Sequence, residues 1–203
     1  MSISPRPAIT LAAIVAIISA LIIVMYNVTY VDTSGVLTDK QSAAAVAVYG
    51  GSPEDYSVVP AEIKDDSGNV TGGWQMKLAS LPDADRVLKV IEKNDGSLAF
   101  DIKTKGYKDG FDILVGVKDG AVAGVAVVSV GEETPGLGTK TNDPAFLDNF
   151  RGITGEAKIV KSAPAADGEV QAVTSATFSS RGVAKAVNIA LAAYEMYMGG
   201  DQQ

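Results

Sequence analysis

A cluster of hydroxyl side chains near the C-terminal end of the sequence is the best candidate for a site of chemistry. Five Ser and Thr residues fall within the seven positions 174–180, and Arg181 follows them. A long Ala-rich apolar stretch comes next, which is typical of a helix. The backbone N–H groups that open a helix lack intrahelical partners, and the helix dipole favours an anion there. The cluster is therefore a candidate phosphate site, with Ser179 and Ser180 as further donors and Arg181 as a positive charge.

The same residues have a structural alternative. Ser and Thr side chains commonly cap the N-terminus of a helix, where they accept hydrogen bonds from its first N–H groups. Residue types alone do not separate a capped helix from an anion site, so both interpretations stay open at this point.

A glycine-rich segment, residues 131–141, is a second candidate. Glycines let a backbone approach a planar ligand closely, and Glu133, Thr134 and Thr139 supply hydrogen-bonding atoms. The segment is not a phosphate-binding P-loop, because Thr139 separates Gly138 from the following Lys. A solvated surface turn is the alternative, with a Pro-Gly pair in the type II position.

The absence of His and Cys from the whole sequence limits the chemistry further. Without Cys the chain cannot hold a Cys-ligated iron–sulfur cluster, and without His it lacks the commonest metal ligand and general base. A Ser nucleophile would then need a Lys base, and no Ser stands three residues before a Lys. A hydrolase is therefore disfavoured, no catalytic residue is predicted, and redox chemistry would need an organic cofactor.

The charge pattern excludes two further classes of site. The formal net charge of -7 argues against a nucleic-acid partner, because nucleic-acid-binding surfaces are normally basic. The acidic pairs Asp65-Asp66 and Glu132-Glu133 fall in turn-like segments, where solvated side chains are expected. No metal site is predicted.

Residues 8–26 form an uncharged apolar run near the N-terminus. As a helix this run would be roughly 28 Å long, close to the hydrocarbon thickness of a bilayer. A cleaved signal peptide is the alternative, but its apolar region is usually shorter and a small-x-small cleavage site follows it. No such site follows this run. We therefore expect a retained anchor in residues 1–30 and one domain in residues 31–203.

The charges around the run predict its orientation. Arg6 is the only charged residue before Asp32, so the positive-inside tendency places the N-terminus in the cytoplasm and the domain outside. Tyr26 and Tyr30 stand where interfacial aromatic residues are expected.

The remaining pattern predicts an α+β domain with a mainly antiparallel sheet flanked by helices. Asp-Gly pairs between apolar runs indicate hairpins, and residues 111–117 are apolar enough to need cover on both faces of the sheet. Residues 50–70 and 131–142 are expected to be mostly loop. The expected strands are 86–93, 98–105, 111–117, 121–130 and a stretch near 169–173, and the expected helices are 38–49, 143–150 and 178–198. The last helix should bury one face, made of Val183, Val187, Ala190, Leu191, Tyr194 and Met198.

Together these elements resemble the FMN-binding G subunit of the Rnf complex, an ion-translocating ferredoxin:NAD oxidoreductase of bacterial membranes. The related C subunit of the sodium-translocating NADH:quinone reductase is the nearest alternative. The resemblance is carried by the N-terminal span, Gly106-Tyr107, the loop Glu133–Gly138 and the tetrad Thr174–Thr177. It implies FMN held as a phosphoester on Thr177, attached by a dedicated flavin transferase with FAD as donor. It also places the loop Glu133–Gly138 near the isoalloxazine ring.

The resemblance implies a role in electron transfer within a membrane complex. The chain would relay single electrons between neighbouring redox subunits, coupled in the complex to Na⁺ or H⁺ movement, and would have no turnover alone. The residues expected at the cofactor are Glu133, Thr134, Leu137, Gly138, Thr139, Thr174, Ser175, Ala176, Thr177, Ser179, Ser180 and Arg181.

Two positions depart from the family pattern. Ser175 replaces the Gly of the tetrad, and Gln171 replaces an acidic residue often found six positions before the modified Thr. Ser is less favourable than Gly if position 175 needs a positive φ.

Two non-redox alternatives are a membrane-anchored binding module and a pseudopilin-like filament subunit, although the latter needs a Glu that residues 8–26 lack.

Overall fold

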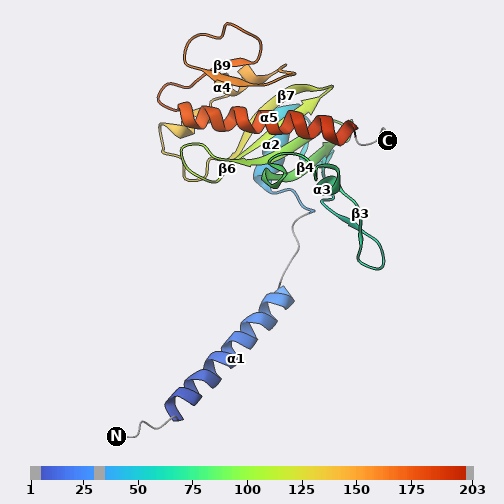
Figure 1. Cartoon of the computed structure of the whole chain (residues 1–203), viewed down its shortest axis with the longest axis vertical. Helices are drawn as coiled ribbons and strands as arrows, with labels where there is room; N and C mark the ends of the chain where they lie inside the picture. The colour runs from blue at the N-terminus through green and yellow to red at the C-terminus, as the bar shows by residue number, and fades with distance from the viewer. Residues whose placement is uncertain (1–5, 30–34, 200–203) are drawn as a thin grey trace. The chain divides into compact units, whose positions relative to one another are not determined.

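The computed structural model describes residues 6–29 and 35–199 of the chain. Contacts divide the chain into two units, Met1–Ser34 and Gly35–Gln203, and each is described by itself. The first contains α1 (Arg6–Thr29), which is long and apolar enough to cross a membrane (Figure 1). Near its end the side chains of Asn27 and Thr29 donate hydrogen bonds to carbonyls one turn earlier. The expected apolar helix is confirmed, whereas Tyr30 and Asp32 lie outside the described residues.

The second unit is built on one five-stranded sheet with the order β1-β4-β5-β6-β7, in which all neighbours are antiparallel. The strands are β1 (Tyr56–Val59), β4 (Val87–Lys93), β5 (Leu98–Thr104), β6 (Phe111–Lys118) and β7 (Ala121–Ser129). The last two strands are joined by Asp119 and Gly120, whose φ values of 52° and 77° are typical of a type I′ turn. The predicted meander is confirmed. β1 lies within residues 50–70, which were expected to be mostly loop, and it extends the sheet at one edge.

Two helices cover the two faces of the sheet. On one face α5 (Thr177–Gly199) packs against β5, β6 and β7 (Figure 1). On the other face α2 (Asp39–Tyr49) packs against β6 and β7. Alternate residues of β6 therefore face different helices: Ile113 joins the core of α5 and Leu114 joins that of α2. The prediction that β6 is covered on both faces is confirmed.

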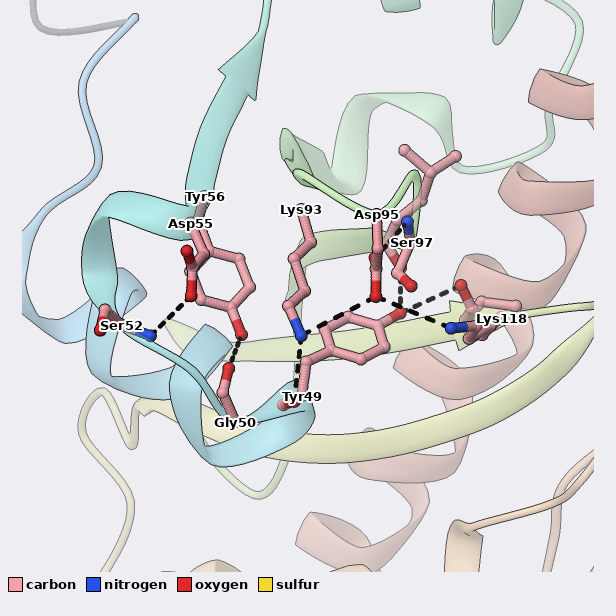
Figure 2. Close-up of polar contacts among 11 residues, drawn as sticks. Tyr49, Gly50, Ser52, Asp55, Tyr56, Lys93, Asp95, Ser97 and Lys118 are labelled. Atoms are coloured by element: carbon pink, nitrogen blue, oxygen red, sulfur yellow. Dashed lines mark hydrogen bonds and ion pairs between the residues drawn. The ribbon is translucent and has the colours of Figure 1, made fainter.

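The capping box predicted at Thr38 and Gln41 is present, and it fixes the start of α2. The C-terminal end of α2 is held by a polar cluster, which Figure 2 shows. The Tyr49 hydroxyl lies 2.7 Å from the Leu98 carbonyl oxygen and 3.0 Å from that of Val117. Lys93 donates a hydrogen bond to the Tyr49 carbonyl. Both ends of α2 are thus fixed by hydrogen bonds.

Short elements complete the fold, and several of them were not predicted. They are η1 (Pro53–Asp55), β2 (Ile63–Lys64), β3 (Val70–Gly72), α3 (Trp74–Lys77), η2 (Ala84–Arg86), η3 (Gly138–Asn142), α4 (Pro144–Leu147), η4 (Asp148–Phe150), β8 (Lys158–Val160) and β9 (Glu169–Gln171). Asp143 caps α4 as expected, by accepting a hydrogen bond from the Ala145 N–H. Met198 was expected on the buried face of α5, but it is 51% exposed because it lies in the last turn of that helix.

Candidate functional site

The hydroxyl cluster lies at the junction between β9 and α5. A tight turn precedes the helix, closed by a hydrogen bond of 2.9 Å from the Ala176 N–H to the Val173 carbonyl. Ser175 occupies the third position of this turn with a φ of 66°, which is the left-handed conformation that a type II turn requires there. The condition under which Ser is less favourable than Gly at position 175 is therefore met.

The Ser180 side chain holds this turn against the helix. Its hydroxyl accepts a hydrogen bond from the Val173 N–H and donates one to the Ala176 carbonyl, each at 3.0 Å. Ser180 is fully buried and lies outside the pocket described next. Its hydroxyl stabilises the turn, a role the sequence did not predict.

A pocket of about 300 Å³ opens beside the first turn of α5. Its volume is at the lower end of the range for small-molecule sites. The pocket combines residues from the β5–β6 turn, the 131–141 loop and the start of α5. The lining residues are Tyr107, Thr134, Leu137, Gly138, Ser175, Ala176, Thr177, Phe178 and Ser179. The fold thus brings together the two segments that the sequence singled out.

Thr177 is the first residue of α5 and lines the pocket. Its side chain is half-buried, and its hydroxyl has no hydrogen-bond partner among residues 6–29 and 35–199. The Ser180 N–H bonds to the Ala176 carbonyl, so the N–H groups of residues 177–179 are those left without a helical partner. A free hydroxyl therefore stands at a helix end whose dipole favours an anion.

Other residues expected at the site lie outside the pocket. Arg181 is exposed and lines a different surface hollow, together with Lys185 and Asn188. Thr139 accepts a hydrogen bond from the Gly136 N–H at 2.9 Å and so shapes the loop. Thr174 is exposed in the turn and does not line the pocket. The positive charge expected beside the phosphate is thus not on the pocket wall, because the helix directs Arg181 to another side.

Glu133 differs from its sequence-based interpretation as half of a solvated acidic pair. It is only 5% exposed, whereas Glu132 is exposed as predicted. The Glu133 carboxylate accepts hydrogen bonds from the Ser179 hydroxyl at 2.7 Å and from the Lys108 N–H at 2.9 Å. The solvated interpretation is therefore wrong for Glu133, and it holds for Asp65 and Asp66, which are both exposed.

Two aromatic side chains at the pocket were not predicted as site residues. Tyr107 and Phe178 are 62% and 61% exposed, with ring centroids 6.4 Å apart and planes tilted by 58°. Leu137, on the same pocket, is 44% exposed. Exposed aromatic rings beside a pocket can pack against a planar ligand. The usable sequence signal was their position, because Phe178 lies within the hydroxyl cluster and Tyr107 belongs to the Gly106-Tyr107 pair that carries the resemblance.

The comparisons with known proteins agree with this geometry. The model of the FMN-binding domain family matches residues 106–192, which include every residue that lines the pocket. The G subunit of the proton-translocating ferredoxin:NAD⁺ oxidoreductase complex of Clostridium ljungdahlii is 31% identical over 129 residues, covering 58% of this chain and 69% of that protein. The chain belongs to the FMN-binding G-subunit family. The resemblance noted from the sequence is therefore confirmed.

A second relative matches over a smaller part of its length. The G subunit of the Na⁺-translocating ferredoxin:NAD⁺ oxidoreductase complex of Acetobacterium woodii is 29% identical over 113 residues, and this chain spans about half the length of that protein, 54%. Among solved structures, NqrC of Shewanella oneidensis has a TM-score of 0.49 and 20% identity, covering 70% of this chain and 83% of that chain. The C subunit of the Na⁺-translocating NADH-quinone reductase of Parabacteroides distasonis has a TM-score of 0.44 and 24% identity, and the match covers 54% of this chain and 61% of that chain.

Proposed function

We propose that this chain is an electron-transfer subunit of a membrane-bound, ion-translocating ferredoxin:NAD⁺ oxidoreductase complex and carries FMN covalently on Thr177. One observation carries the proposal: an unpartnered, half-buried hydroxyl lines a pocket at the start of α5, inside the FMN-binding region. The two curated relatives are named as G subunits of such complexes, which supports the assignment to a complex.

The pocket residues fit the two chemically different ends of FMN. A phosphoester on Thr177 would face the unpaired N–H groups of residues 177–179, where the helix dipole stabilises the remaining negative charge. The apolar surfaces of Tyr107, Leu137 and Phe178 would contact the ring system, and Thr134 adds a polar group at the pocket wall.

Attachment requires a group transfer that the chain does not perform alone. A flavin transferase would bring FAD to the free hydroxyl of Thr177. The Thr177 oxygen would bond to the phosphorus of the FMN half as the pyrophosphate P–O bond breaks, and AMP and the hydroxyl proton would be released. Of the five clustered hydroxyls, those of Ser179 and Ser180 are already engaged in hydrogen bonds.

When bound, the flavin supplies one-electron exchange with neighbouring redox subunits. This chain supplies the binding surface, the orientation of the cofactor and the local charge around it. The helix α1 serves as a retained anchor in the proposal, with Arg6 on the cytoplasmic side and the FMN domain outside. Covalent attachment would then prevent loss of the cofactor from an extracytoplasmic domain.

The test is to express the full chain together with a flavin transferase and to examine the band by ultraviolet fluorescence in a denaturing gel. Peptide mass mapping then locates the flavin. We expect a fluorescent band that Thr177→Ala abolishes and that Ser175→Ala retains. Ser175 is the matched control because it also lines the pocket with a hydroxyl that has no partner among the described residues.

Two results would contradict the proposal in different ways. A non-fluorescent wild-type band in cells with an active transferase would exclude the covalent flavoprotein and favour a non-redox binding module. Fluorescence that survives Thr177→Ala but is lost in Ser175→Ala would move the attachment to Ser175.

A further inference from the structure

The carboxylate of Glu133 joins the three chain segments that form the pocket. Glu133 lies in the loop after β7, and Ser179 and Lys108 are its two hydrogen-bond donors. Ser179 belongs to the first turn of α5, and Lys108 follows Tyr107 in the turn between β5 and β6. One buried side chain therefore connects the loop, the helix start and the turn whose residues line the pocket.

Two glycines make room for this carboxylate. A Cβ atom at Gly106 would overlap Glu133 Oε1, and a Cβ atom at Gly138 would overlap Oε2. Neither glycine has a positive φ, so space rather than backbone conformation requires glycine at both positions. The carboxylate is thus packed between two backbone segments, and its oxygens are directed at its two donors rather than at the pocket.

The chemistry of the two hydrogen bonds requires a carboxylate. The Ser179 hydroxyl and the Lys108 N–H both donate, so the residue at position 133 must present two acceptors. An ionised carboxylate does so, and hydrogen bonds to a charged acceptor are stronger than neutral ones. A glutamine of the same shape would direct its NH₂ group at one of the two donors, and one hydrogen bond would be lost.

We propose that Glu133 is a positioning residue of the flavin site. Its carboxylate fixes the first turn of α5 against the loop and the β5–β6 turn, so that the Thr177 hydroxyl and the apolar surfaces of Tyr107 and Leu137 keep one mutual geometry. This inference rests on the proposed flavin attachment at Thr177. It assigns Glu133 to holding the pocket walls, without direct contact with the cofactor.

The experiment compares Glu133→Gln with Glu132→Gln in the full chain, expressed together with the transferase. Glu132 is the adjacent exposed residue, so the control makes the same charge change without touching the pocket. Ser179→Ala is the milder variant, because it removes one hydrogen bond and keeps the carboxylate. The flavinylated fraction is measured as a function of time by mass spectrometry, and amide hydrogen exchange is measured over residues 106–108 and 133–138 on the same variants expressed without the transferase. The absorption spectrum of the attached flavin is the third measurement.

We expect Glu133→Gln to lower the rate of flavin attachment on the order of tenfold relative to Glu132→Gln, because small displacements of a reacting group slow its reaction strongly. Hydrogen exchange in both segments should accelerate, and the spectrum of any attached flavin should shift. Ser179→Ala should change the attachment rate, the hydrogen exchange and the flavin spectrum in the same direction, but by less than Glu133→Gln does. Equal attachment, exchange and spectrum in Glu133→Gln and Glu132→Gln would overturn the proposal.

The experiment also distinguishes failure of Glu133→Gln to fold from failure of the proposed function. If thermal melting shows that Glu133→Gln does not fold, the same three measurements on Ser179→Ala decide, and an unchanged Ser179→Ala overturns the proposal. If the wild-type chain carries no flavin, the proposed function fails. In that case unchanged hydrogen exchange in Glu133→Gln would also overturn the positioning role, and accelerated exchange would support it.

Discussion

The two faces of the central sheet are both covered by a helix, but they are stabilised by different kinds of side chain. The α5 face buries large apolar groups, among them Phe100 and Phe111, which are both fully buried. The α2 face buries smaller groups such as Ala45 and Ala99, and it also holds the buried carboxylate Asp101. The α5 face is therefore packed mainly by large apolar groups, whereas the α2 face combines smaller groups with a buried carboxylate within the sheet.

The buried carboxylates of the two regions have different partners. Glu133, beside the start of α5, has a donor for each of its oxygens. Asp101 accepts one hydrogen bond from the Gln41 amide at 2.6 Å, and its Oδ1 has no partner in the described part of the chain. Burial raises the pKa of Asp101 to about 6, the nearby Asp112 also raises it, and the Gln41 hydrogen bond and Lys89 lower it. The comparison indicates that the α2 face is the pH-sensitive side of the domain.

The largest expected effect is on the α5 face. Phe111→Ala should lower the free energy of unfolding by about 3–5 kcal/mol, because it leaves a cavity in a fully buried site. Val48→Ala on the α2 face should lower it by only about 2 kcal/mol, since fewer atoms are removed. Urea unfolding of the full chain at constant pH measures both. Equal losses in the two variants would contradict this prediction.

The second prediction concerns the pH dependence of stability. Since the pKa of Asp101 is raised from 3.8 to about 6 on folding, the folded state binds its proton more tightly. The free energy of unfolding should therefore fall as the pH rises from about 4 to about 6, by at most about 3 kcal/mol, and this contribution should then stay constant.

Asp101→Asn should flatten this slope, whereas Asp66→Asn, a change at an exposed carboxylate, should leave it intact. The groups that surround Asp101 are Gln41 of α2, Lys89 of β4 and Asp112 of β6. Burial also raises the pKa of Asp112, so a residual slope should remain in Asp101→Asn. An unchanged slope would assign the pH sensitivity to other groups.

The smallest expected effect is at the turn before α5. Ser175→Gly should relieve the left-handed strain of about 1 kcal/mol and lose part of that gain to the greater freedom of an unfolded glycine. We expect a net stabilisation of about 0.5 kcal/mol. Ser175→Ala keeps the Cβ atom and should show no gain in the same unfolding measurement. A stabilised Ser175→Ala would mean that the hydroxyl, and not the backbone, is unfavourable.

Features set by local sequence were predictable in this chain. The Asp119-Gly120 hairpin, the capping box at Thr38 and the apolar pattern of residues 111–117 determine local conformation, and the structure has each as expected. Strands β1 and β8 were missed because they are short and gain their stability from pairing with β4 and β9, outside their own local sequence.

The candidate site likewise has features that the sequence predicted and features that it did not. Pattern and resemblance located the cluster and the loop, but the roles of single side chains depend on contacts between distant segments. The burial of Glu133 requires Gly106 and Gly138 to meet on either side of it, which its turn-like neighbourhood does not indicate. The pairing of Tyr107 with Phe178 across the pocket likewise depends on how the β5–β6 turn approaches α5.

The position of Thr177 at the first residue of a long, well-packed helix has a mechanical consequence. α5 runs for 23 residues and is anchored along its length by side chains such as Val183 and Val187, which are fully buried in the core. The backbone of its first residue is therefore held at a fixed position on the domain surface, and so is the attachment point of any group bonded to the Thr177 hydroxyl. If Thr177 carries the flavin as proposed, the attachment point can move between a donor and an acceptor only when the whole domain moves.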